Sequence, residues 1–423
     1  MHLRPRVVEL ATVINDAVTK IAQIISEQGA AWPSFSEGAP VSHPKEADEL
    51  KEAILDATAE LHDLLLDPMS LIYKAATRYH LSSLEFIGRF EIASMVPAGG
   101  SISYGDIAQK TGMNEQMTRR LVRHAMTMRI FHEPEPGMVA HTQASKLLQS
   151  LEVNAFMRFH PDIGWPTSVK MIDALKKWPG SQEPNETAFS LANNENISIY
   201  DVFTREPERA LDFASGMRAF GSLSKFHIDR VVEAYDWESL GQATLVDVGG
   251  SQGGLAIAVA KEHRKLRFIV QDMAKVVEGA HAAVPADFQN RISFMAHDFF
   301  TLQTVTADVY ILRTVLHNWA DKYCVIILRS LVPALQPGAR ILINDICLPK
   351  PGSMPAHRER DLRCMDLSMG ALFNAQERDL LEWKALLAQA DSRFVLQRVI
   401  QSDRSALAII EVVWKVQGAE GAS

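Results

Sequence analysis

The 423-residue sequence has little cysteine, no long apolar run and no excess of basic residues. Its three cysteines, Cys324, Cys347 and Cys364, form no C-x-x-C pair, so they indicate neither a disulfide framework nor a zinc site. No stretch is long and apolar enough to span a bilayer, and the N-terminal apolar residues recur at helical spacing, unlike a signal peptide. We therefore expect a cytoplasmic protein with no membrane contact and no bound metal.

The charge balance argues against a nucleic-acid partner. The formal net charge is −8, and such a surface repels phosphate unless basic side chains cluster strongly. A helix-turn-helix pattern over 111–129 contains one such cluster, Arg119, Arg120 and Arg123. A winged-helix DNA-binding regulator is therefore an alternative. It is disfavoured because DNA affinity needs several phosphate contacts and the acid Glu133 follows closely.

The chain is long enough for two domains, and its pattern changes near residue 240. Residues 1–235 are dominated by helical patterns, beginning with an amphipathic helix over 1–30 and a linker rich in Pro, Ser and Gly over 31–46. The stretch 96–142 has the order strand, helix, turn, helix and hairpin, with the hairpin around Pro136-Gly137. That order is typical of a winged helix.

Residues 240–423 alternate short apolar runs with helical segments, which predicts an α/β fold with a parallel sheet covered by helices on both faces. The expected strands lie in ATLVDVGG (243–250), LRFIVQD (266–272), RISFMAHD (291–298), ADVYILRTVLHNW (307–319) and ARILINDICL (339–348). The last two runs, 394–403 and 405–415, are joined by a short polar turn and predict an antiparallel pair at one edge. A doubly wound, Rossmann-like sheet that ends in such a pair is the methyltransferase variant of the fold.

A glycine-rich loop follows the first of these strands and opens a helix. It contains Gly249 and Gly250 after Asp247, and the next strand ends in Asp272, where an acid binds ribose hydroxyls in nucleotide sites. Ser251 occupies the position at which a dinucleotide loop needs glycine for its pyrophosphate, and Asp247 suits a positive amino group. The pattern therefore favours S-adenosylmethionine (SAM) over NAD. The alternative is a tight structural turn with a solvated Asp.

From residue 240 onward the chain resembles the caffeic-acid-type, SAM-dependent small-molecule O-methyltransferases of plants and fungi. The segments VDVGGSQGG, FIVQD, HDFF, LRTVLHNWAD, PGARILINDICLP and ERDLLEWKALLAQA occur in the family's order, and the winged helix also fits. The resemblance implies a C-terminal class I methyltransferase domain over 240–423. It also implies an N-terminal, all-helical winged-helix domain over 1–235 that forms a homodimer and covers the pocket of a small-molecule substrate.

The resemblance also implies site residues. It places Gly249 at the methionine end of SAM, Asp272 at the ribose, and Asp298 with Phe299 at the adenine. With the loop residues, the expected cofactor-binding set is Asp247, Gly249, Gly250, Asp272, Asp298, Phe299, Arg313 and Trp319. His317 matches the catalytic base, and Asp345 and Glu377 match the two acids that flank it. Asp345 departs from the plant members, which carry Glu, and its shorter side chain leaves a gap that a water molecule can fill.

The chemistry that the resemblance implies is methylation of a phenol or enol hydroxyl of a secondary metabolite. A free phenol has a pKa of about 10 and a free histidine one of about 6.5, so deprotonation in neutral water is unfavourable. A positioned imidazole takes the proton as the oxygen attacks. Asp345 or Glu377 would fix the tautomer of His317 and favour its protonated form.

Each assignment has a structural alternative. His317 is one of 14 histidines and could be a packed loop residue. Asp345 could be a cap or turn acid, and Glu377 with Arg378 could form a helix-start pair. Arg313 could be a surface cation.

Two further alternatives concern Trp319 and the reaction. Trp319 could belong to the core alone. A SAM-binding pericyclase or dehydratase would keep the fold and change the reaction, because fold does not fix function. The His-Asn-Trp segment and both acids favour methyl transfer, and a nitrogen acceptor stays open.

Overall fold

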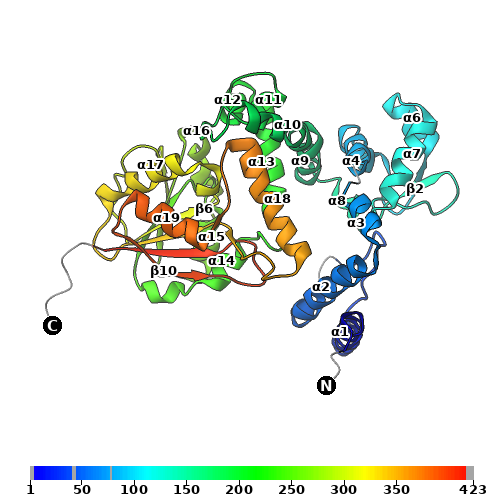
Figure 1. The fold of residues 1–423 in the computed structure, drawn as a ribbon, viewed down its shortest axis with the longest axis horizontal. Coiled ribbons are helices and arrows are strands. Elements are labelled where there is room, and N and C mark those ends of the chain that lie inside the picture. The colour runs from blue at the N-terminus through cyan, green and yellow to red at the C-terminus, as the bar shows by residue number, and fades with distance from the viewer. Residues whose placement is uncertain (1–3, 41–43, 77–78, 416–423) are drawn as a thin grey trace. The chain divides into compact units, whose positions relative to one another are not determined.

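The computed structural model describes residues 4–40, 44–76 and 79–415, drawn as a ribbon in Figure 1. By internal contacts the chain divides into two compact units. The first unit comprises Met1–Trp165, Glu208–Ala219 and Gly352–Arg360, and the second comprises Pro166–Pro207, Phe220–Pro351 and Asp361–Ser423. The predicted domains, 1–235 and 240–423, follow the sequence pattern, whereas the units follow contacts. The helical segments 166–207 and 220–240 therefore group with the sheet.

The first unit is built almost entirely from helices. These are α1 (Arg6–Gln28), α2 (Asp48–Leu65), α3 (Pro68–Ala75), α4 (His80–Arg89), α5 (Ile92–Met95), α6 (Tyr104–Thr111), α7 (Glu115–Met126), α8 (Gln143–Leu147), α9 (Leu151–Phe159) and most of α13 (Pro207–Gly221). Helix α1 confirms the helix predicted over 1–30. Its buried residues Leu10, Ala17 and Ile25 lie on one face, and Gly29 ends it with φ +60°.

The winged-helix order is confirmed by strands β1 (Ser101–Ser103) and β2 (Met138–Ala140), which flank α6 and α7. The hairpin predicted around Pro136-Gly137 is only partly correct. Strand β2 pairs with β1, and the chain before the turn contributes a single bridge, between His132 and Ala140. Proline has no N–H to donate, and two prolines in this arm, Pro134 and Pro136, keep it from extending the ladder.

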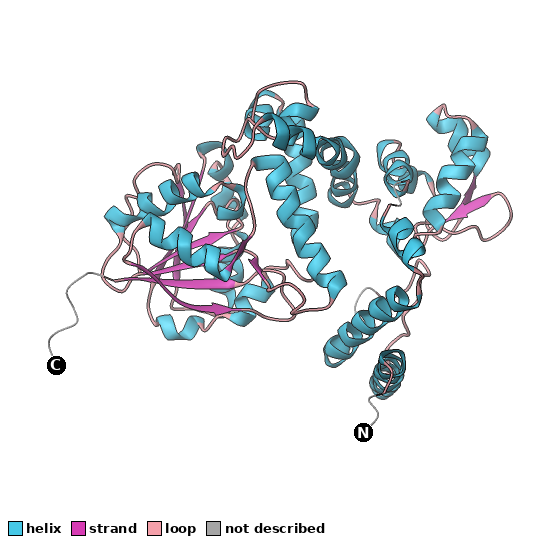
Figure 2. Cartoon of the chain, in the orientation of Figure 1, coloured by secondary structure: helices cyan, strands magenta, loops and turns pink. Residues whose placement is uncertain are grey.

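The second unit contains the sheet and the helices around it, coloured by type in Figure 2. Its helices are α10 (Trp165–Lys177), α11 (Ala188–Ala192), α12 (Ile199–Arg205), α14 (Asp229–Ala234), α15 (Gly254–Glu262), α16 (Ala274–Val277), α17 (Asp321–Leu331), α19 (Leu380–Ala390) and most of α18 (Ala356–Phe373). Its main strands are β3 (Thr244–Val248), β4 (Arg267–Asp272), β5 (Ile292–Ala296), β6 (Val309–Arg313), β7 (Arg340–Asn344), β10 (Phe394–Ile400) and β11 (Ile409–Trp414).

The seven strands form one sheet in the order β10-β11-β7-β6-β3-β4-β5. Strands β3 to β7 run parallel, whereas β11 pairs antiparallel with both β7 and β10. This confirms the predicted doubly wound sheet with an antiparallel pair at one edge. Since the parallel strands share a direction, the residues that follow β3, β4, β6 and β7 meet at one edge of the sheet.

Side chains that alternate along each strand enter two separate cores. In β6, Tyr310 and Leu312 join the core that holds α17 and α19, while Val309 and Ile311 join the core that holds α14 and α15. Figure 1 shows these helices covering the two faces. Burial on both faces explains why the strands are continuous apolar runs without polar alternation.

Two segments differ from the predicted pattern. The sequence of residues 275–284 predicts one helical segment, but it is interrupted at Gly279, which has φ +71° and separates α16 from a short 3-10 turn. The apolar run over 307–319 forms a strand only as far as Arg313, where its pairing with Asn344 of β7 ends. The chain then turns at Thr314, with φ +51°, into the 3-10 turn Leu316–Asn318. His317 therefore lies on a turn beyond the strand.

Among the described residues, no helix has the length and apolar character needed to cross a membrane.

Candidate active site

Three of the predicted residues meet beyond the carboxyl edge of the sheet. His317 lies on the turn after β6, and Asp345 directly follows β7. Glu377 precedes the short strand β9 (Arg378–Asp379), which pairs in parallel with β8 (Cys347–Leu348). This small pairing ties the chain after Asp345 to the chain after Glu377 and so brings both acids to the histidine.

His317 and Glu377 form a buried hydrogen-bonded pair. The distance from His317 Nδ1 to Glu377 Oε1 is 2.9 Å, and the two side chains are 12% and 0% exposed. An ionised carboxylate can only accept, so Nδ1 carries the hydrogen and Nε2 keeps its lone pair. Burial alone would lower the pKa of His317, but the bond and charge of Glu377 and the charge of Asp345 raise it above its ordinary value.

Asp345 is fully buried, and neither carboxylate oxygen accepts a hydrogen bond within the protein. Burial raises the pKa of Asp345 to about 6, although the His317 imidazole acts to lower it. The His317 ring bonds to Glu377, and Asp345 makes no hydrogen bond to it. This agrees with the gap predicted from the shorter side chain of Asp345. Asp345 caps no helix, and its role beside His317 stays a prediction.

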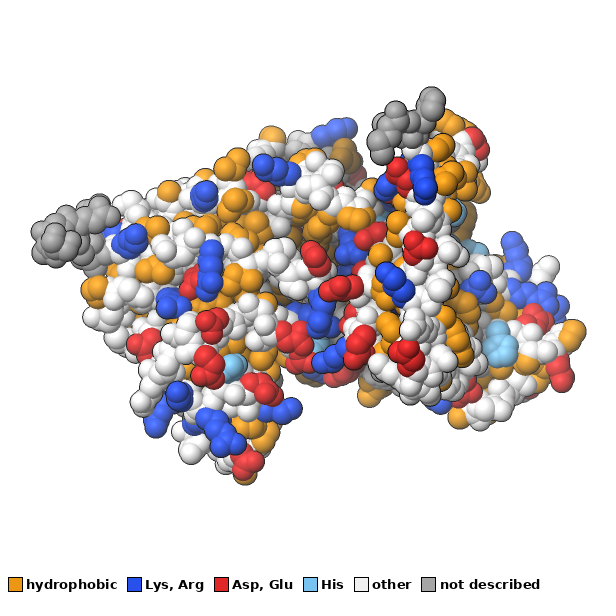
Figure 3. Space-filling view, turned by 90° about the horizontal axis from the view of Figure 1, so that it is seen from below, with side chains coloured by type: hydrophobic (Ala, Val, Ile, Leu, Met, Phe, Trp, Pro, Cys, Tyr) orange, Lys and Arg blue, Asp and Glu red, His pale blue; other side chains and the backbone are white. Residues whose placement is uncertain are grey.

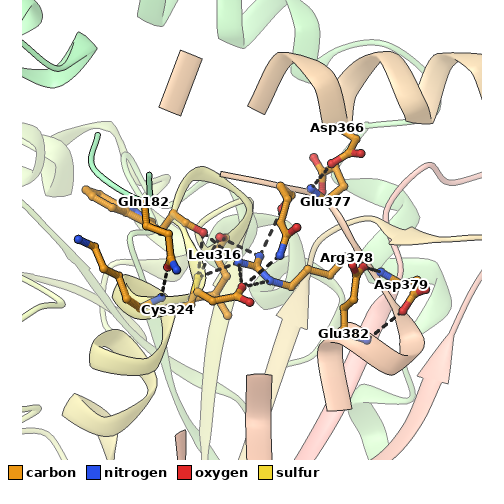
Figure 4. Close-up of polar contacts among 12 residues, drawn as sticks. Gln182, Leu316, Cys324, Asp366, Glu377, Arg378, Asp379 and Glu382 are labelled. Atoms are coloured by element: carbon orange, nitrogen blue, oxygen red, sulfur yellow. Dashed lines mark hydrogen bonds and ion pairs between the residues drawn. The ribbon is translucent and has the colours of Figure 1, made fainter. Parts of the chain in front are cut away.

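Glu377 does not start a helix. The N-cap of α19 is Asp379, which forms a capping box with Glu382. Instead, the Glu377 backbone N–H donates to Asp366 on α18 at 2.9 Å, as Figure 4 shows, and Glu377 Oε2 has no partner within the protein. The helix-start alternative is therefore wrong.

Arg378, named from the sequence only in that alternative, is fully buried and bonds to the turn that carries His317. The only signal that could have found it is its place directly after Glu377. An arginine in a buried position is rare unless its charge is paired.

The glycine loop is shaped by the protein's own packing. Gly249 has φ +73°, and the N–H groups of Gly249 and Gly250 both approach the Gln271 carbonyl, at 2.8 and 3.1 Å. A Cβ atom on Gly250 would lie 2.5 Å from Asp247 Cγ, so only glycine fits above that carboxylate. Ser251 has φ +51°, in the left-handed region that favours glycine, so the motif's usual residue there suits the backbone.

Asp247 lies under this loop with its Oδ2 atom buried and without a partner in the protein. Burial raises the pKa of Asp247 to about 7. The positive charge of Arg313 acts to lower this pKa, and the negative charge of Asp272 acts to raise it. A cationic group bound at the loop would stabilise the ionised carboxylate. The residues present therefore fit the positive amino group of a SAM methionine moiety.

Asp272 fastens the loop to the end of β4. Its Oδ2 accepts from the Ser251 N–H at 2.9 Å, and its Oδ1 accepts from the Met273 N–H at 2.8 Å. Each carboxylate oxygen has a second lone pair, so Asp272 retains capacity for the ribose hydroxyls that the resemblance assigns to it.

Arg313 is anchored inside the fold and is no surface cation. Its guanidinium donates to the Asn344 side chain and to the Phe226 carbonyl. Burial lowers the pKa of Arg313, which the charges of Asp247 and Asp345 oppose. Arg313 thus interacts electrostatically with both Asp247 and Asp345.

The residues assigned to the adenine lie in two turns. Asp298 accepts from the Phe300 N–H at 3.0 Å and so closes its own turn, while the Phe299 ring lies 3.8 Å from the position of a Cβ on Gly249. Trp319 stacks on Tyr200, with ring centroids 5.3 Å apart, and meets Phe300 edge-on at 4.7 Å. These contacts agree with the core alternative for Trp319, and its adenine role stays a prediction.

Two of the three clustered arginines of the winged helix pair with acids within the first unit. Arg119 pairs with Glu115 at 2.6 Å, and Arg123 makes two bonds to Glu133, at 2.8 and 2.9 Å. On the face drawn in Figure 3, basic and acidic side chains are interspersed without a broad area of one sign. Phosphate binding by Arg119 and Arg123 would require these pairs to break.

Comparisons with known proteins identify the family. A family model for the O-methyltransferase domain matches residues 175–393. The O-methyltransferase PaMT of Phomopsis amygdali is 43% identical over 412 residues, which cover 97% of this chain and 96% of PaMT. The chain belongs to the O-methyltransferase family. Another relative of this O-methyltransferase is the chlorophenol O-methyltransferase of Trichoderma longibrachiatum, 36% identical over 97% of this chain and 90% of that protein.

Solved structures support the fold of the O-methyltransferase. OxaC in complex with S-adenosylhomocysteine (SAH) and oxaline is 22% identical with a TM-score of 0.75, over 97% of this chain and all of OxaC. A structure described as a pericyclic reaction enzyme is 21% identical with a TM-score of 0.73, over 96% of this chain and 100% of its own, and at that identity shows the fold alone. The pericyclase alternative therefore has less support than methyl transfer. The protein is a SAM-dependent enzyme that methylates an oxygen of a small molecule, as predicted.

Proposed function

We propose that His317 is the general base that removes the proton from a phenol or enol hydroxyl as that oxygen is methylated. The observation that carries this proposal is the 2.9 Å hydrogen bond from the buried His317 ring to Glu377. With Nδ1–H donated to Glu377, Nε2 is the free acceptor, which is the arrangement of base and orienting acid in other triads.

The electrostatics support the same role. The pKa of His317 is raised, so it lies closer to that of a phenol, which is about 10. Proton transfer from the phenol to His317 is therefore less unfavourable. Glu377 and Asp345 stabilise the imidazolium that forms when Nε2 takes the proton. When bound, SAM supplies a methyl carbon already activated by its sulfonium.

We assign the cofactor contacts as the sequence predicts them. Asp247 would hold the amino group of SAM, Gly249 and Gly250 would let the loop approach it closely, and Asp272 would hold the ribose. Asp298, Phe299 and Trp319 would enclose the adenine, and Arg313 would contact the cofactor.

The substrate class follows from the relatives and the base. A relative that methylates chlorophenol suits a site whose histidine removes a phenolic proton. The test is transfer of label from methyl-labelled SAM to 4-chlorophenol, to resorcinol and to an extract of fungal secondary metabolites. We expect His317→Ala to reduce turnover by about 10²–10⁴-fold with unchanged SAH affinity. Equal labelling by both proteins would remove His317 as the base, and SAH binding without any turnover would favour the pericyclase alternative.

We further propose that the protein is a homodimer and that residues 1–235 provide its interface and cover the substrate. Large apolar side chains that a monomer would leave in water gather on α2 and α3. They are Leu64, Leu65, Met69 and Ile72, each at least 50% exposed. A second copy is the occupant that buries them in a closed pair. Analytical ultracentrifugation should find a dimer for the wild type and a monomer for Met69→Glu/Ile72→Glu. A monomeric wild type would overturn this proposal.

We also propose a cytoplasmic protein that binds neither nucleic acid nor membrane. The three cysteines are free thiols, as suits a reducing compartment, and Arg119 and Arg123 of the winged helix have acidic partners. A gel shift with duplex DNA at moderate salt should show no complex, and a complex would overturn this part of the proposal.

A further inference from the structure

The guanidinium of Arg378 is buried behind the turn that carries His317. Arg378 is 0% exposed, and its Cζ lies 5.3 Å from the centroid of the Trp383 ring. Figure 4 shows its side chain reaching from β9 to the 316–321 segment. A fully buried positive charge is costly to keep in a protein interior, because it loses its hydration.

The bonds of Arg378 converge on that turn. Nη1 donates to the Leu316 carbonyl at 3.3 Å, and Nη2 donates to the Trp319 carbonyl at 2.9 Å. These two carbonyls lie on either side of His317 in the chain. Nε and Nη2 also donate to Asp321 Oδ1, at 2.9 and 2.6 Å. A single planar fork therefore holds both ends of the segment from 316 to 321.

Cys324 supports the same two carbonyls. Its thiol lies 3.2 Å from both the Leu316 and the Trp319 oxygen, and Arg378 Nη2 lies 3.4 Å from its sulfur. Burial raises the pKa of Cys324 to about 12, so the group remains a thiol donor. The turn is therefore held from within by one cation and one thiol.

The turn needs such support because its entry is strained. Thr314 has φ +51°, and a β-branched residue rarely adopts that conformation. Strained backbone near a functional site persists only where surrounding contacts hold it in place. The fixed carbonyls of Leu316 and Trp319, two and five residues later, provide that constraint.

We propose that Arg378 is a positioning residue for methyl transfer, which holds the turn 316–321 so that the His317 ring keeps its bond to Glu377. This inference rests on the proposed role of His317 as the base. The two adjacent residues have separate roles: Glu377 bonds to the ring of His317, and Arg378 bonds to backbone carbonyls on either side of it. Arg378 touches neither the imidazole nor a reacting atom.

The charge of Arg378 has a second, separable consequence. The charged groups that act on His317 are Glu377 and Asp345, which raise its pKa, and Arg378, which lowers it. A neutral side chain at 378 therefore raises the pKa of His317, whereas lysine keeps the charge and removes only the fork. The two substitutions separate geometry from charge.

The first test is the rate of methyl transfer from labelled SAM to 4-chlorophenol. We expect Arg378→Lys to lower kcat about 10-fold and Arg378→Gln about 100-fold, because small displacements of a catalytic group have effects of this size. SAH affinity, measured by calorimetry, should not change. Wild-type kcat in Arg378→Lys would overturn the proposal, and this variant decides the matter if Arg378→Gln does not fold.

Arg291 provides a matched control in the same unit. It also holds three backbone carbonyls, those of Ala260, His263 and Leu266, and its Cζ lies 5.5 Å from the Phe288 ring centroid. Its carbonyls belong to the end of α15 and to the loop that enters β4, far along the chain from His317. Arg291→Lys should therefore leave kcat within about twofold of wild type, the size of roughly 0.4 kcal/mol. An equal loss in Arg291→Lys and Arg378→Lys would mean that both arginines merely stabilise the fold.

The second test does not depend on turnover. The imidazole signal of His317, assigned by its loss in His317→Asn, is titrated by NMR. We expect its pKa to fall in Arg378→Lys, because the bond to Glu377 weakens while the charge at 378 stays, and to be higher in Arg378→Gln than in Arg378→Lys, because the charge is lost as well. A wild-type titration in Arg378→Lys would overturn the positioning role, and equal titrations in the two variants would contradict the effect of the Arg378 charge on His317.

A double mutant separates this inference from the proposed function. If Arg378 acts through His317, Arg378→Lys should lower kcat in the wild type and have no effect in His317→Ala. An equal loss in both backgrounds would overturn the positioning role. Wild-type kcat in His317→Ala would instead overturn the base, while the titration would still report on Arg378.

Discussion

Glu133 in the winged helix and the acids at the carboxyl edge of the sheet have the same chemical group in opposite surroundings. Glu133 accepts two bonds from Arg123, one from the Tyr104 hydroxyl at 3.0 Å and one from the Gly137 N–H at 2.6 Å. The Arg123 bonds, followed by the Gly137 bond, lower the pKa of Glu133 to about 2. Its bonding capacity is used in joining α6, α7 and the loop that leads to β2.

The acids of the sheet edge are left short of partners. Asp247 Oδ2, both oxygens of Asp345 and Glu377 Oε2 are buried and accept no hydrogen bond within the protein. Burial raises the pKa of Asp247 to about 7 and that of Asp345 to about 6. An acid whose oxygens all have hydrogen-bond partners thus maintains the fold, whereas a buried acid that lacks partners is available to a proton or a cationic ligand.

The largest effect should come from Glu377→Gln. Gln keeps the shape but removes the charge that raises the pKa of His317, so the acid limb of the rate profile should move to lower pH. Loss of the orienting carboxylate should also reduce kcat by about 100-fold. Turnover measured between pH 5 and 9 checks both expectations. An unmoved acid limb would show that Glu377 does not act on the base.

Asp247→Asn should act on the cofactor. A bond to a charged group contributes about 1.5–3 kcal/mol, so the affinity for SAH at pH 8 should fall by about 10–100-fold. Wild-type affinity should rise between pH 6 and 8 as Asp247 ionises near pH 7, and the variant should lack this rise. Calorimetry over this range provides the measurement, and a pH dependence retained in the variant would exclude Asp247 as its source.

The same substitution should stabilise the free protein. The pKa of Asp247 is raised from its ordinary value to about 7, so the folded state binds more protons between pH 4 and 7 and stability falls as pH rises through that range. Asp247→Asn removes this penalty, and the Tm at pH 8 should rise by about 2–4 °C. Thermal melts at pH 4.5 and 8 should show the gain only at the higher pH.

Asp345→Asn should have a smaller effect on the rate. Asp345 makes no bond to the ring, and its charge only adds to that of Glu377 in raising the pKa of His317. We expect kcat to fall about 5-fold, the size of roughly 1 kcal/mol. Asp345→Glu, which lengthens the arm, should retain the wild-type rate. A loss as large as that of Glu377→Gln would mean that the two acids have equal roles.

Glu133→Gln should leave kcat unchanged and reduce stability. The pKa of Glu133 lies below its ordinary value, so its contribution is present above about pH 4.3 and is lost as pH falls towards 2. At pH 7 the Tm should fall by about 2–4 °C, and the difference from wild type should shrink as pH falls from about 4.3 towards 2. A change in kcat would contradict the claim that Glu133, unlike the acids of the sheet edge, serves only the fold.

The sequence was sufficient for the sheet, because strands buried on both faces are continuous apolar runs that need no long-range information. It was insufficient for the turn at Thr314, since a threonine with positive φ carries no sequence signal. It also did not decide which acid bonds to His317. That choice depends on the pairing of Cys347 with Arg378 and on the one-methylene difference in length between Asp345 and Glu377.

The role of Arg378 also could not be predicted from the sequence. Its role depends on carbonyls that belong to a turn about 60 residues earlier in the chain. Only the folded chain brings the fork and the turn together. The resemblance identified His317 and its two flanking acids. The structure showed that Glu377 bonds to His317, that Asp345 does not, and that Arg378 holds the turn from behind.

The most direct measurement of the central claim is the ¹⁵N chemical shifts of the His317 imidazole in the free enzyme, assigned by difference from His317→Asn. At a pH where the ring is neutral, hydrogen on Nδ1 and a lone pair on Nε2 are expected, with the tautomer less fixed in Glu377→Gln. Hydrogen on Nε2 with a lone pair on Nδ1 would leave no acceptor for the substrate proton and would contradict the account.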